Sequence, residues 1–162
     1  MLEYTTSLIL MVDPITVTFI EGMLLSMVLG YLMGAERELR GKDAGISTHI
    51  FVLGGAMIFT MLSNIVDPAS TSRIAAQIVT GIGFLCAGLI LKEGSNVRNL
   101  TTAASLWFAA AIGMTIGYGY YAIAIIAGLA SIFIPRIRHM KTEAYERQLE
   151  EEKRERRKRA KK

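Results

Sequence analysis

The chain has 162 residues, of which 52% are hydrophobic and 20% are charged, and its formal net charge is +4. The excess of base belongs to the end of the chain, because residues 1–135 carry six basic and eight acidic side chains whereas residues 136–162 carry twelve and six. The one cysteine, Cys86, excludes a disulfide within the chain. These features predict a small apolar domain over 1–135 and a basic, charge-rich tail over 136–162.

Five apolar stretches follow one another in the first domain, at 15–35, 50–66, 74–91, 100–116 and 120–134. Each is close to, or just under, the roughly 17 to 25 residues that cross a hydrocarbon core of about 30 Å. The first contains one formal charge, Glu21, and the other four contain none. Apolar residues cover all faces of these segments, which is typical of a bilayer and not of a soluble domain. We predict an all-α integral membrane protein, a compact bundle of five transmembrane helices.

The basic residues predict the orientation of this bundle. The connections 36–49 and 92–99, together with the tail, carry seventeen of the eighteen Lys and Arg residues, and only Arg73 lies on the other side. Cytoplasmic loops of membrane proteins carry an excess of Lys and Arg. We therefore predict that the N-terminus lies outside and the C-terminus in the cytoplasm.

Small residues repeat every four positions in the first and fourth stretches. They are Gly22, Ser26, Gly30 and Gly34, and then Ser105, Ala109, Gly113 and Gly117. In a bilayer such faces allow two helix backbones to approach closely. We expect them to pack the bundle internally, and the alternative is a contact within a homo-oligomer.

Polar residues at membrane depth are candidates for function. For Glu21, about two turns into the first stretch, we favour a carboxylate that reaches the outer headgroups over one that faces an outward cavity. Arg73 and Gln77 stand one helical turn apart at the outer mouth of the third stretch. There Arg73 is placed to pair with Asp67 or Glu21, and we favour a structural ion pair over a substrate clamp.

The third stretch has three glycines in its middle, Gly81, Gly83 and Gly88. Each glycine lowers helix propensity by about 1 kcal/mol relative to alanine. We favour close contact with neighbouring helices as the compensation. The alternative is a locally unwound segment whose carbonyl groups line an ion or water path.

Further polar residues gather where the first stretch ends and the second and fourth begin. They are Glu36, Arg37, Asp43, Thr48, Asn99, Thr101 and Thr102. The positive ends of the second and fourth helices can hold a carboxylate such as Glu36 or Asp43. We predict Glu36 and Arg37 at the centre of this inner polar cluster, with Thr101 and Thr102 donating to it. Its role is interpreted as a cytoplasmic gate, a docking surface, or a capping network that only stabilises the bundle.

The tail is predicted to be partly helical or disordered. Its end, 153–162, holds eight bases and one acid, and such a cluster is attracted to anionic lipid headgroups by about 1 kcal/mol per base. Nucleic acid is a weaker candidate partner, because aromatic residues are not interleaved with the bases.

Four motifs, in order, resemble the MgtC/SapB family of bacterial and archaeal membrane proteins. They are Gly-Ala-Glu-Arg-Glu at 34–38 with Ala-Gly at 44–45 and Thr-His at 48–49, Arg-Ile-Ala-Ala-Gln at 73–77, Gly-Ile-Gly-Phe at 81–84 with Ala-Gly at 87–88, and Leu-Thr-Thr-Ala at 100–103 with Trp107. The motifs cover about residues 20–118. The resemblance implies a five-span domain in a bacterial or archaeal cell (inner) membrane, with a link to growth under low magnesium and, in pathogens, to virulence.

The chain departs from this family pattern at three positions. Ser47 stands where the family usually has Arg, which removes a cation from the inner loop, and Cys86 replaces a common Gly. Asn99 stands where Gly often precedes Leu-Thr-Thr. Because Asn is a good helix N-cap, we expect Asn99 to cap the fourth helix.

The favoured function is a regulatory or interaction protein in magnesium-linked ion or energy homeostasis, which packs against a membrane-protein partner. The alternative is a direct transporter or channel for Mg²⁺ or another cation. The oxygen ligands that Mg²⁺ prefers are available at Glu36, Glu38 and Asp43, although no ligand spacing singles them out, and His49 is interpreted as a hydrogen-bonding residue. We expect no cofactor and no enzyme activity, because no nucleophile, base and orienting group converge.

Overall fold

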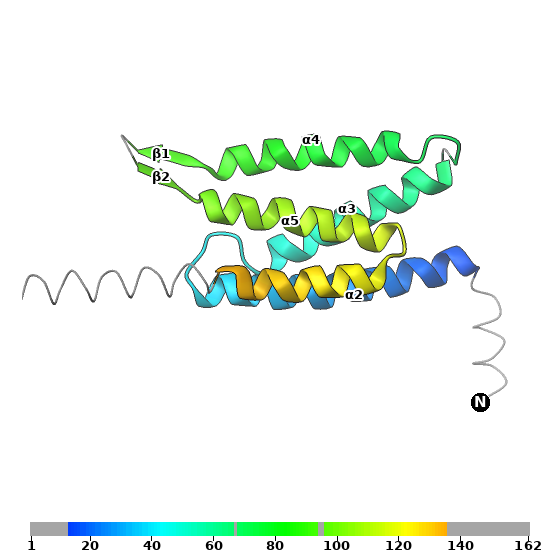
Figure 1. Ribbon diagram of the computed structural model, residues 1–162, viewed down its shortest axis with the longest axis horizontal. Helices are drawn as coiled ribbons and strands as arrows, with labels where there is room; N and C mark the ends of the chain where they lie inside the picture. Colours follow the sequence, from blue (N-terminus) through cyan, green and yellow to red (C-terminus); the bar gives the residue numbers. More distant parts are fainter. Residues whose placement is uncertain (1–12, 67, 94–95, 136–162) are drawn as a thin grey trace, which may run out of the picture.

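The computed structural model describes residues 13–66, 68–93 and 96–135, and the statements below concern these ranges. Each of the five apolar stretches forms a helix there. The helices are α2 (Pro14–Leu39), α3 (Ile46–Val66), α4 (Ser72–Leu89), α5 (Leu100–Gly117) and a last helix, Tyr121–Pro135. Successive helices run in opposite directions along one long axis (Figure 1).

The apolar character of the helices fits a bilayer. Helices α2, α3, α4 and α5 are long and apolar enough to cross a membrane, whereas Tyr121–Pro135 is shorter. Large apolar side chains such as Leu24, Phe51 and Phe84 are exposed on the long helices, as contact with lipid allows. The chain is a multi-pass, mostly helical membrane protein, which confirms this part of the sequence prediction.

Two helices extend further into polar sequence than the hydropathy pattern predicted. Helix α2 continues to Leu39 and α3 begins at Ile46, so Glu36, Arg37 and Thr48 are all helical residues. A helix keeps its own backbone hydrogen bonds beyond the hydrocarbon core, so the end of an apolar run does not end the helix.

Helix α2 begins at a well-formed N-cap. The Asp13 carboxylate accepts hydrogen bonds from the Thr16 N–H at 3.3 Å and from the Thr16 hydroxyl at 2.5 Å. Pro14 occupies the first helical turn, where its missing N–H costs nothing. The hydrogen bond from the Thr16 side chain lowers the pKa of the Asp13 carboxyl group, which keeps the cap ionised at the positive end of the helix.

A short β-hairpin replaces the predicted end of the third stretch and the connection after it. Strand β1 (Leu91–Glu93) pairs antiparallel with β2 (Asn96–Arg98), and Lys92 lies opposite Val97. The prediction that Leu91 belongs to a membrane helix was therefore wrong, because α4 ends at Leu89 and Ile90 is extended. The sequence held a signal for this hairpin, since the Gly-Ser pair at 94–95 is typical of a two-residue hairpin turn.

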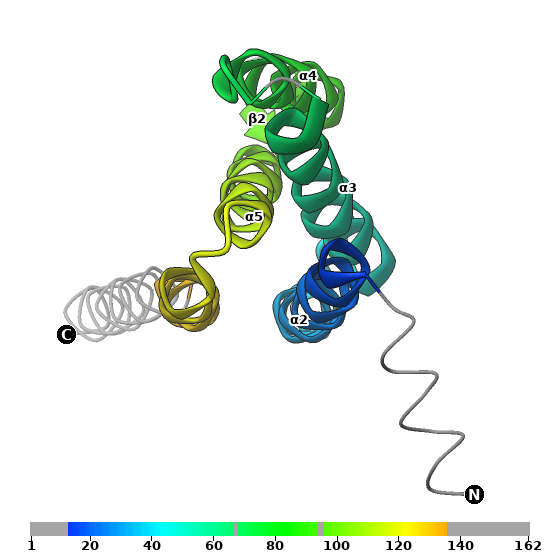
Figure 2. The same cartoon turned by 90° about the vertical axis from the view of Figure 1, so that its right-hand side faces the viewer.

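Helix α3 is the central element. It contacts α2, α4 and α5, and Figure 2 shows it running between α2 and α4 with α5 alongside. The main core lies where α2, α3, α5 and the last helix meet, and includes Leu29, Met33, Leu53, Met57, Ala109, Ile112, Ile116 and Ala124. A smaller cluster joins α4 to α5 and consists of Ala44, Cys86, Ala103 and Leu106.

The small residues of α2 and α5 lie against α3. A Cβ atom added to Gly30 would meet the Ile50 Cα at 2.8 Å, and one added to Gly117 would meet the Met57 carbonyl oxygen at 2.6 Å. Only glycine permits so close an approach of two backbones. Of the predicted packing residues, Gly22, Ser26, Gly30, Gly34, Ala109 and Gly113 are buried, and Ser105 and Gly117 are half-buried.

The two ends of the bundle differ in chemistry. We call the end with the 40–45 turn, the β-hairpin and Pro135 the hairpin end (Figure 1). At the opposite end, the Tyr118 hydroxyl donates to the Thr71 carbonyl oxygen at 3.3 Å and so joins the α3–α4 turn to the end of α5. Of the basic residues that the structure describes, all except Arg73 belong to the segments at the hairpin end.

Candidate functional site

The hairpin end contains two charged side chains that are buried inside the bundle. Glu36 and Arg37 lie in the last two turns of α2, and their exposed fractions are only 7% and 4%. Both are buried because α2 continues past its apolar run while α3 and α5 still pack beside it. Buried charges in a membrane protein are costly and mark functional candidates.

Arg37 connects α2 to the beginning of α5. Its Nη2 donates a hydrogen bond to the Thr102 Oγ1 at 3.3 Å, and Thr102 is fully buried. The expected direction of this contact was wrong, because the guanidinium has only donors and the hydroxyl therefore accepts. Thr101, the other predicted donor, is exposed, since the neighbouring position on a helix faces about 100° away.

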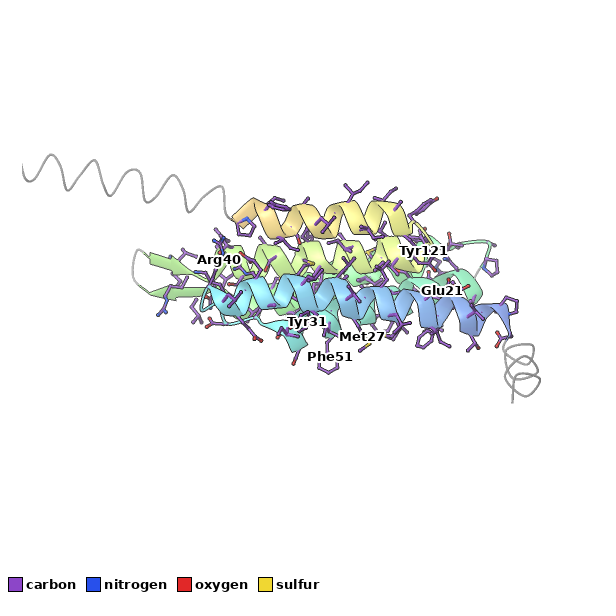
Figure 3. All side chains as sticks on the ribbon, turned by 90° about the horizontal axis from the view of Figure 1, so that it is seen from below. Glu21, Met27, Tyr31, Arg40, Phe51 and Tyr121 are labelled. Atoms are coloured by element: carbon purple, nitrogen blue, oxygen red, sulfur yellow. The ribbon has the colours of Figure 1, made fainter. Side chains whose placement is uncertain are left out.

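Glu36 forms an ion pair with Arg40, one helical turn further along α2. Arg40 Nη1 also donates to the Pro135 carbonyl oxygen at 3.3 Å, so this side chain joins α2 to the end of the last helix. Figure 3 shows Arg40 at the hairpin end, and Glu21 and Tyr121 toward the opposite end. Sequence analysis missed Arg40, although its i, i+4 spacing from Glu36 was the available signal.

His49 adds a buried imidazole from α3. Its Nδ1 lies 2.9 Å from the Gly45 carbonyl oxygen, and its Nε2 is buried without a hydrogen-bond partner among the described residues. It is close enough to Arg37 and Glu36 to interact electrostatically with both. From the sequence, His49 was interpreted only as a hydrogen-bonding residue. The structure also places its imidazole in the buried part of the cluster.

A different carboxylate from the expected ones holds the start of α3. The Ile46 N–H donates to the Glu38 Oε1 at 2.9 Å. We had expected Glu36 or Asp43 in this role, but Glu36 is paired with Arg40. Glu38 reaches the α3 terminus because the 40–45 turn folds Gly45 back against its side chain.

Asn99 occupies the predicted N-cap position of α5, but its side chain makes no capping hydrogen bond. Its φ of 64° and ψ of 10° place it in the left-handed region, and its Nδ2 donates instead to the Asp43 Oδ2 at 2.6 Å. Asn tolerates this backbone conformation better than most residues, and Gly tolerates it best. A left-handed backbone also explains why Gly is common at this position in the resembled pattern.

The predicted cluster therefore separates into two groups. Glu36, Arg37, His49 and Thr102 are buried together, with the half-buried Arg40 paired to Glu36, whereas Asp43 and Asn99 form a pair at the surface. Thr48 is half-buried on α3 and Thr101 is exposed on α5.

The polar residues predicted for the outer side do not form a comparable site. Glu21 and Arg73 are exposed on α2 and α4, and Asp67, a suggested partner of Arg73, lies outside the described residues. Gln77 is exposed and lines an apolar groove between α3 and α4. The basic tail, 136–162, also lies outside the described residues.

The three glycines of α4 contradict both predictions made for them. Helix α4 is continuous through Gly81, Gly83 and Gly88, so no unwound segment exists there. A Cβ atom added to any of the three would meet nothing within 4 Å, so they do not pack against a neighbouring helix of this chain either. In α4 only Ala75 and Cys86 are buried.

One of these glycines lines the groove between α3 and α4. The groove has a volume of about 440 Å³, and its walls are apolar except for Gln77. Its lining includes Phe51, Phe59, Ile74, Ile78, Gly81 and Leu85. Phe51, Phe59 and Leu85 among these lining residues are exposed.

A bundle of long apolar helices with a buried polar cluster at one end defines this chain as a small, multi-pass helical membrane protein. Residues 23–143 match the model of the MgtC family, and the chain belongs to that family. This match confirms the resemblance inferred from the four motifs. No solved structure matches the chain.

Curated relatives share this family name or a related one. "Protein MgtC" from Salmonella typhimurium strain LT2 is 50% identical over 109 residues, which cover 67% of this chain and 47% of the relative. "Putative magnesium transporter YhiD" from Escherichia coli strain K12 is 38% identical over 139 residues, which cover 78% and 63%. "Protein MgtC" from Brucella abortus strain 2308 is 50% identical over 101 residues, which cover 62% and 42%. The chain spans about half the length of the MgtC relatives that it matches.

Proposed function

We propose that this chain is a regulatory or interaction protein in magnesium-linked ion or energy homeostasis, and that it acts by packing against another membrane protein. It would do so as a five-span protein of a bacterial or archaeal inner membrane, with its N-terminus outside and its C-terminus in the cytoplasm. The magnesium link is supported by the name of the Escherichia coli relative and by membership of the MgtC family.

The observation that carries the proposal is the uncovered surface of α4, together with the groove that this helix forms with α3 beside Gly81. Helices in a bilayer associate through small residues that let their backbones approach. On α2 and α5 such residues pack within the bundle, whereas a Cβ atom added to Gly81, Gly83 or Gly88 of α4 would meet no atom of another described helix within 4 Å. The adjoining groove is wide enough for side chains of a further helix and offers one polar group, Gln77.

A direct cation transporter is the second candidate. It is favoured by the buried polar cluster, because ionisable groups inside the bundle of a membrane protein commonly mark ion or proton pathways. Glu36 and His49 would then be the residues along the pathway, with Arg40 as the partner of Glu36.

The proposal is tested by a substitution that places a larger side chain of this chain in the groove. In Gly81→Leu, the new side chain extends into the groove without meeting an atom of the chain near its Cβ. In a strain whose growth at limiting magnesium depends on this chain, the variant should lose that growth while its melting temperature in detergent stays unchanged. Ala130→Leu, at an exposed position of the last helix, is the matched control and should grow like wild type.

A second variant removes partner contact area without adding bulk. Phe51→Ala truncates a groove side chain that is 78% exposed, so it should weaken growth and leave the fold intact. Normal growth of both Gly81→Leu and Phe51→Ala would contradict the interaction function.

A further inference from the structure

We propose that the hairpin end contains a binding site for a phosphate group, formed by Arg37 and the N-terminus of α5. The phosphate would belong either to the headgroup of an anionic phospholipid or to free inorganic phosphate. This inference concerns the buried cluster and does not depend on the α4 groove.

The first observation is that α5 begins without a side-chain cap. Asn99 makes no capping hydrogen bond, and the first backbone bond of the helix runs from the Ala103 N–H to the Asn99 carbonyl oxygen at 2.9 Å. The N–H groups of Leu100, Thr101 and Thr102 precede this bond. In an 18-residue helix they present a partial positive charge that favours an anion.

The second, independent observation is the state of Arg37. Its side chain is 4% exposed, its Nη2 lies against Thr102 in the first turn of α5, and its Nε has no hydrogen-bond partner among the described residues. The adjacent Glu36 is already paired with Arg40. A guanidinium buried in this way gains most from an oxyanion that accepts two of its donors at once.

The first residues of α5 are exposed. Leu100 is 58% exposed and Thr101 is exposed, so the start of α5 faces the surroundings of the hairpin end. A phosphate there can accept from the Thr101 hydroxyl and the helix N–H groups on one side and from Arg37 on the other. Lys42 and Lys92 are exposed in the same end of the bundle and add to its positive field.

One negative group opposes the binding of an anion. The Asp43 carboxylate accepts from the Asn99 Nδ2 at 2.6 Å, so it lies beside the start of α5. Its contact is with the Asn99 side chain and leaves the helix N–H groups to the ligand. Its charge should nevertheless weaken anion binding, which makes Asp43→Asn a variant with a predicted gain.

The test uses the whole 162-residue chain in neutral detergent. Inorganic phosphate is titrated by calorimetry, and phosphatidylglycerol is compared with phosphatidylcholine by counting bound lipids with native mass spectrometry. We expect Arg37→Gln to weaken binding of the active probe about tenfold, the usual worth of one charge-assisted hydrogen bond. Thr101→Val should weaken it several-fold, and Asp43→Asn should strengthen it. The basic tail is common to all variants, so differences among them report the site.

Each outcome decides the proposal. If free phosphate binds, and binds more tightly to Asp43→Asn and more weakly to Thr101→Val and Arg37→Gln than to wild type, the ligand is the free ion. If only phosphatidylglycerol binds and the variants show the same ranking, the ligand is the lipid. If Arg37→Gln fails to fold, as a melting curve would show, the opposite shifts of Thr101→Val and Asp43→Asn still test the site. Absence of binding by both probes, or equal binding by all variants, would overturn the proposal.

Discussion

Arg40 makes two contacts at the hairpin end. It neutralises the buried Glu36 and donates to the Pro135 carbonyl oxygen, so one side chain joins α2 to the last helix. The sequence pattern contained the i, i+4 pair, but it could not show that the carboxylate is buried, because burial depends on how far α3 and α5 extend beside α2.

Removing Arg40 should destabilise the protein. Arg40→Gln leaves the 7% exposed Glu36 carboxylate without its counter-ion, and we expect the free energy of unfolding to fall by about 3 kcal/mol. Glu36→Gln combined with Arg40→Gln should recover part of this loss, because the buried carboxylate that lacked its counter-ion is then replaced by a neutral amide. Lys42→Gln, an exposed base of the same turn, is the control. Denaturant unfolding in detergent measures all four proteins, and equal stability of Arg40→Gln and Lys42→Gln would argue against a buried pair.

The left-handed backbone at Asn99 makes a second prediction at this scale. Asn99→Gly keeps the φ of 64° accessible and should fold with a normal melting temperature despite losing the contact with Asp43. Asn99→Val should cost about 1 to 2 kcal/mol, because a β-branched side chain clashes in this conformation. Thermal unfolding distinguishes the two variants, and a lower stability of the Gly variant than of the Val variant would contradict the backbone assignment.

At the scale of the helix, α2 and α4 use glycine for opposite purposes. Gly30 of α2 lies against the Ile50 backbone, whereas Gly81 of α4 faces open space. Gly30→Ala should therefore lower the free energy of unfolding by about 1 to 3 kcal/mol through overpacking. Gly81→Ala should be neutral or raise it by up to about 1 kcal/mol through helix propensity. The free energies of unfolding are measured with denaturant. Equal changes for the two substitutions would contradict this assignment.

The helices themselves could be predicted from the sequence, but the details of the site could not. Hydropathy located all five helices, because a long uncharged run has few alternatives to a helix in lipid. The same pattern could not say which glycine faces meet a neighbour, since Gly30 and Gly81 look alike in sequence. It also placed Thr101 in the cluster beside Thr102, although successive helical residues face different directions.

The roles of the polar residues at the hairpin end were hardest to predict. Glu38, and not Glu36 or Asp43, meets the start of α3 because of the way the 40–45 turn folds back. Such assignments among neighbouring carboxylates depend on backbone geometry over a few residues, which composition and spacing do not determine. The β-hairpin was missed for another reason, because the apolar Leu91 was counted as a continuation of the membrane helix.

At the scale of the whole molecule, the alternating helices place almost all the described basic residues at one end. We expect this end to face the cytoplasm. In a Cys86→Ala background, a cysteine at Lys42 should be labelled by a membrane-impermeant maleimide only after the cells are opened. A cysteine at Tyr120, 61% exposed at the opposite end, should be labelled in intact cells. The reverse labelling pattern would contradict the proposed orientation.

The central claim, that the protein regulates by interaction and does not itself carry the ion, is tested most directly by Mg²⁺ flux into liposomes that contain only the purified chain. We predict the same uptake as in protein-free liposomes, with no change in the Glu36→Gln or Arg73→Gln variants. Uptake well above that background, and reduced by Glu36→Gln without loss of folding, would contradict the claim and establish transport through the buried cluster.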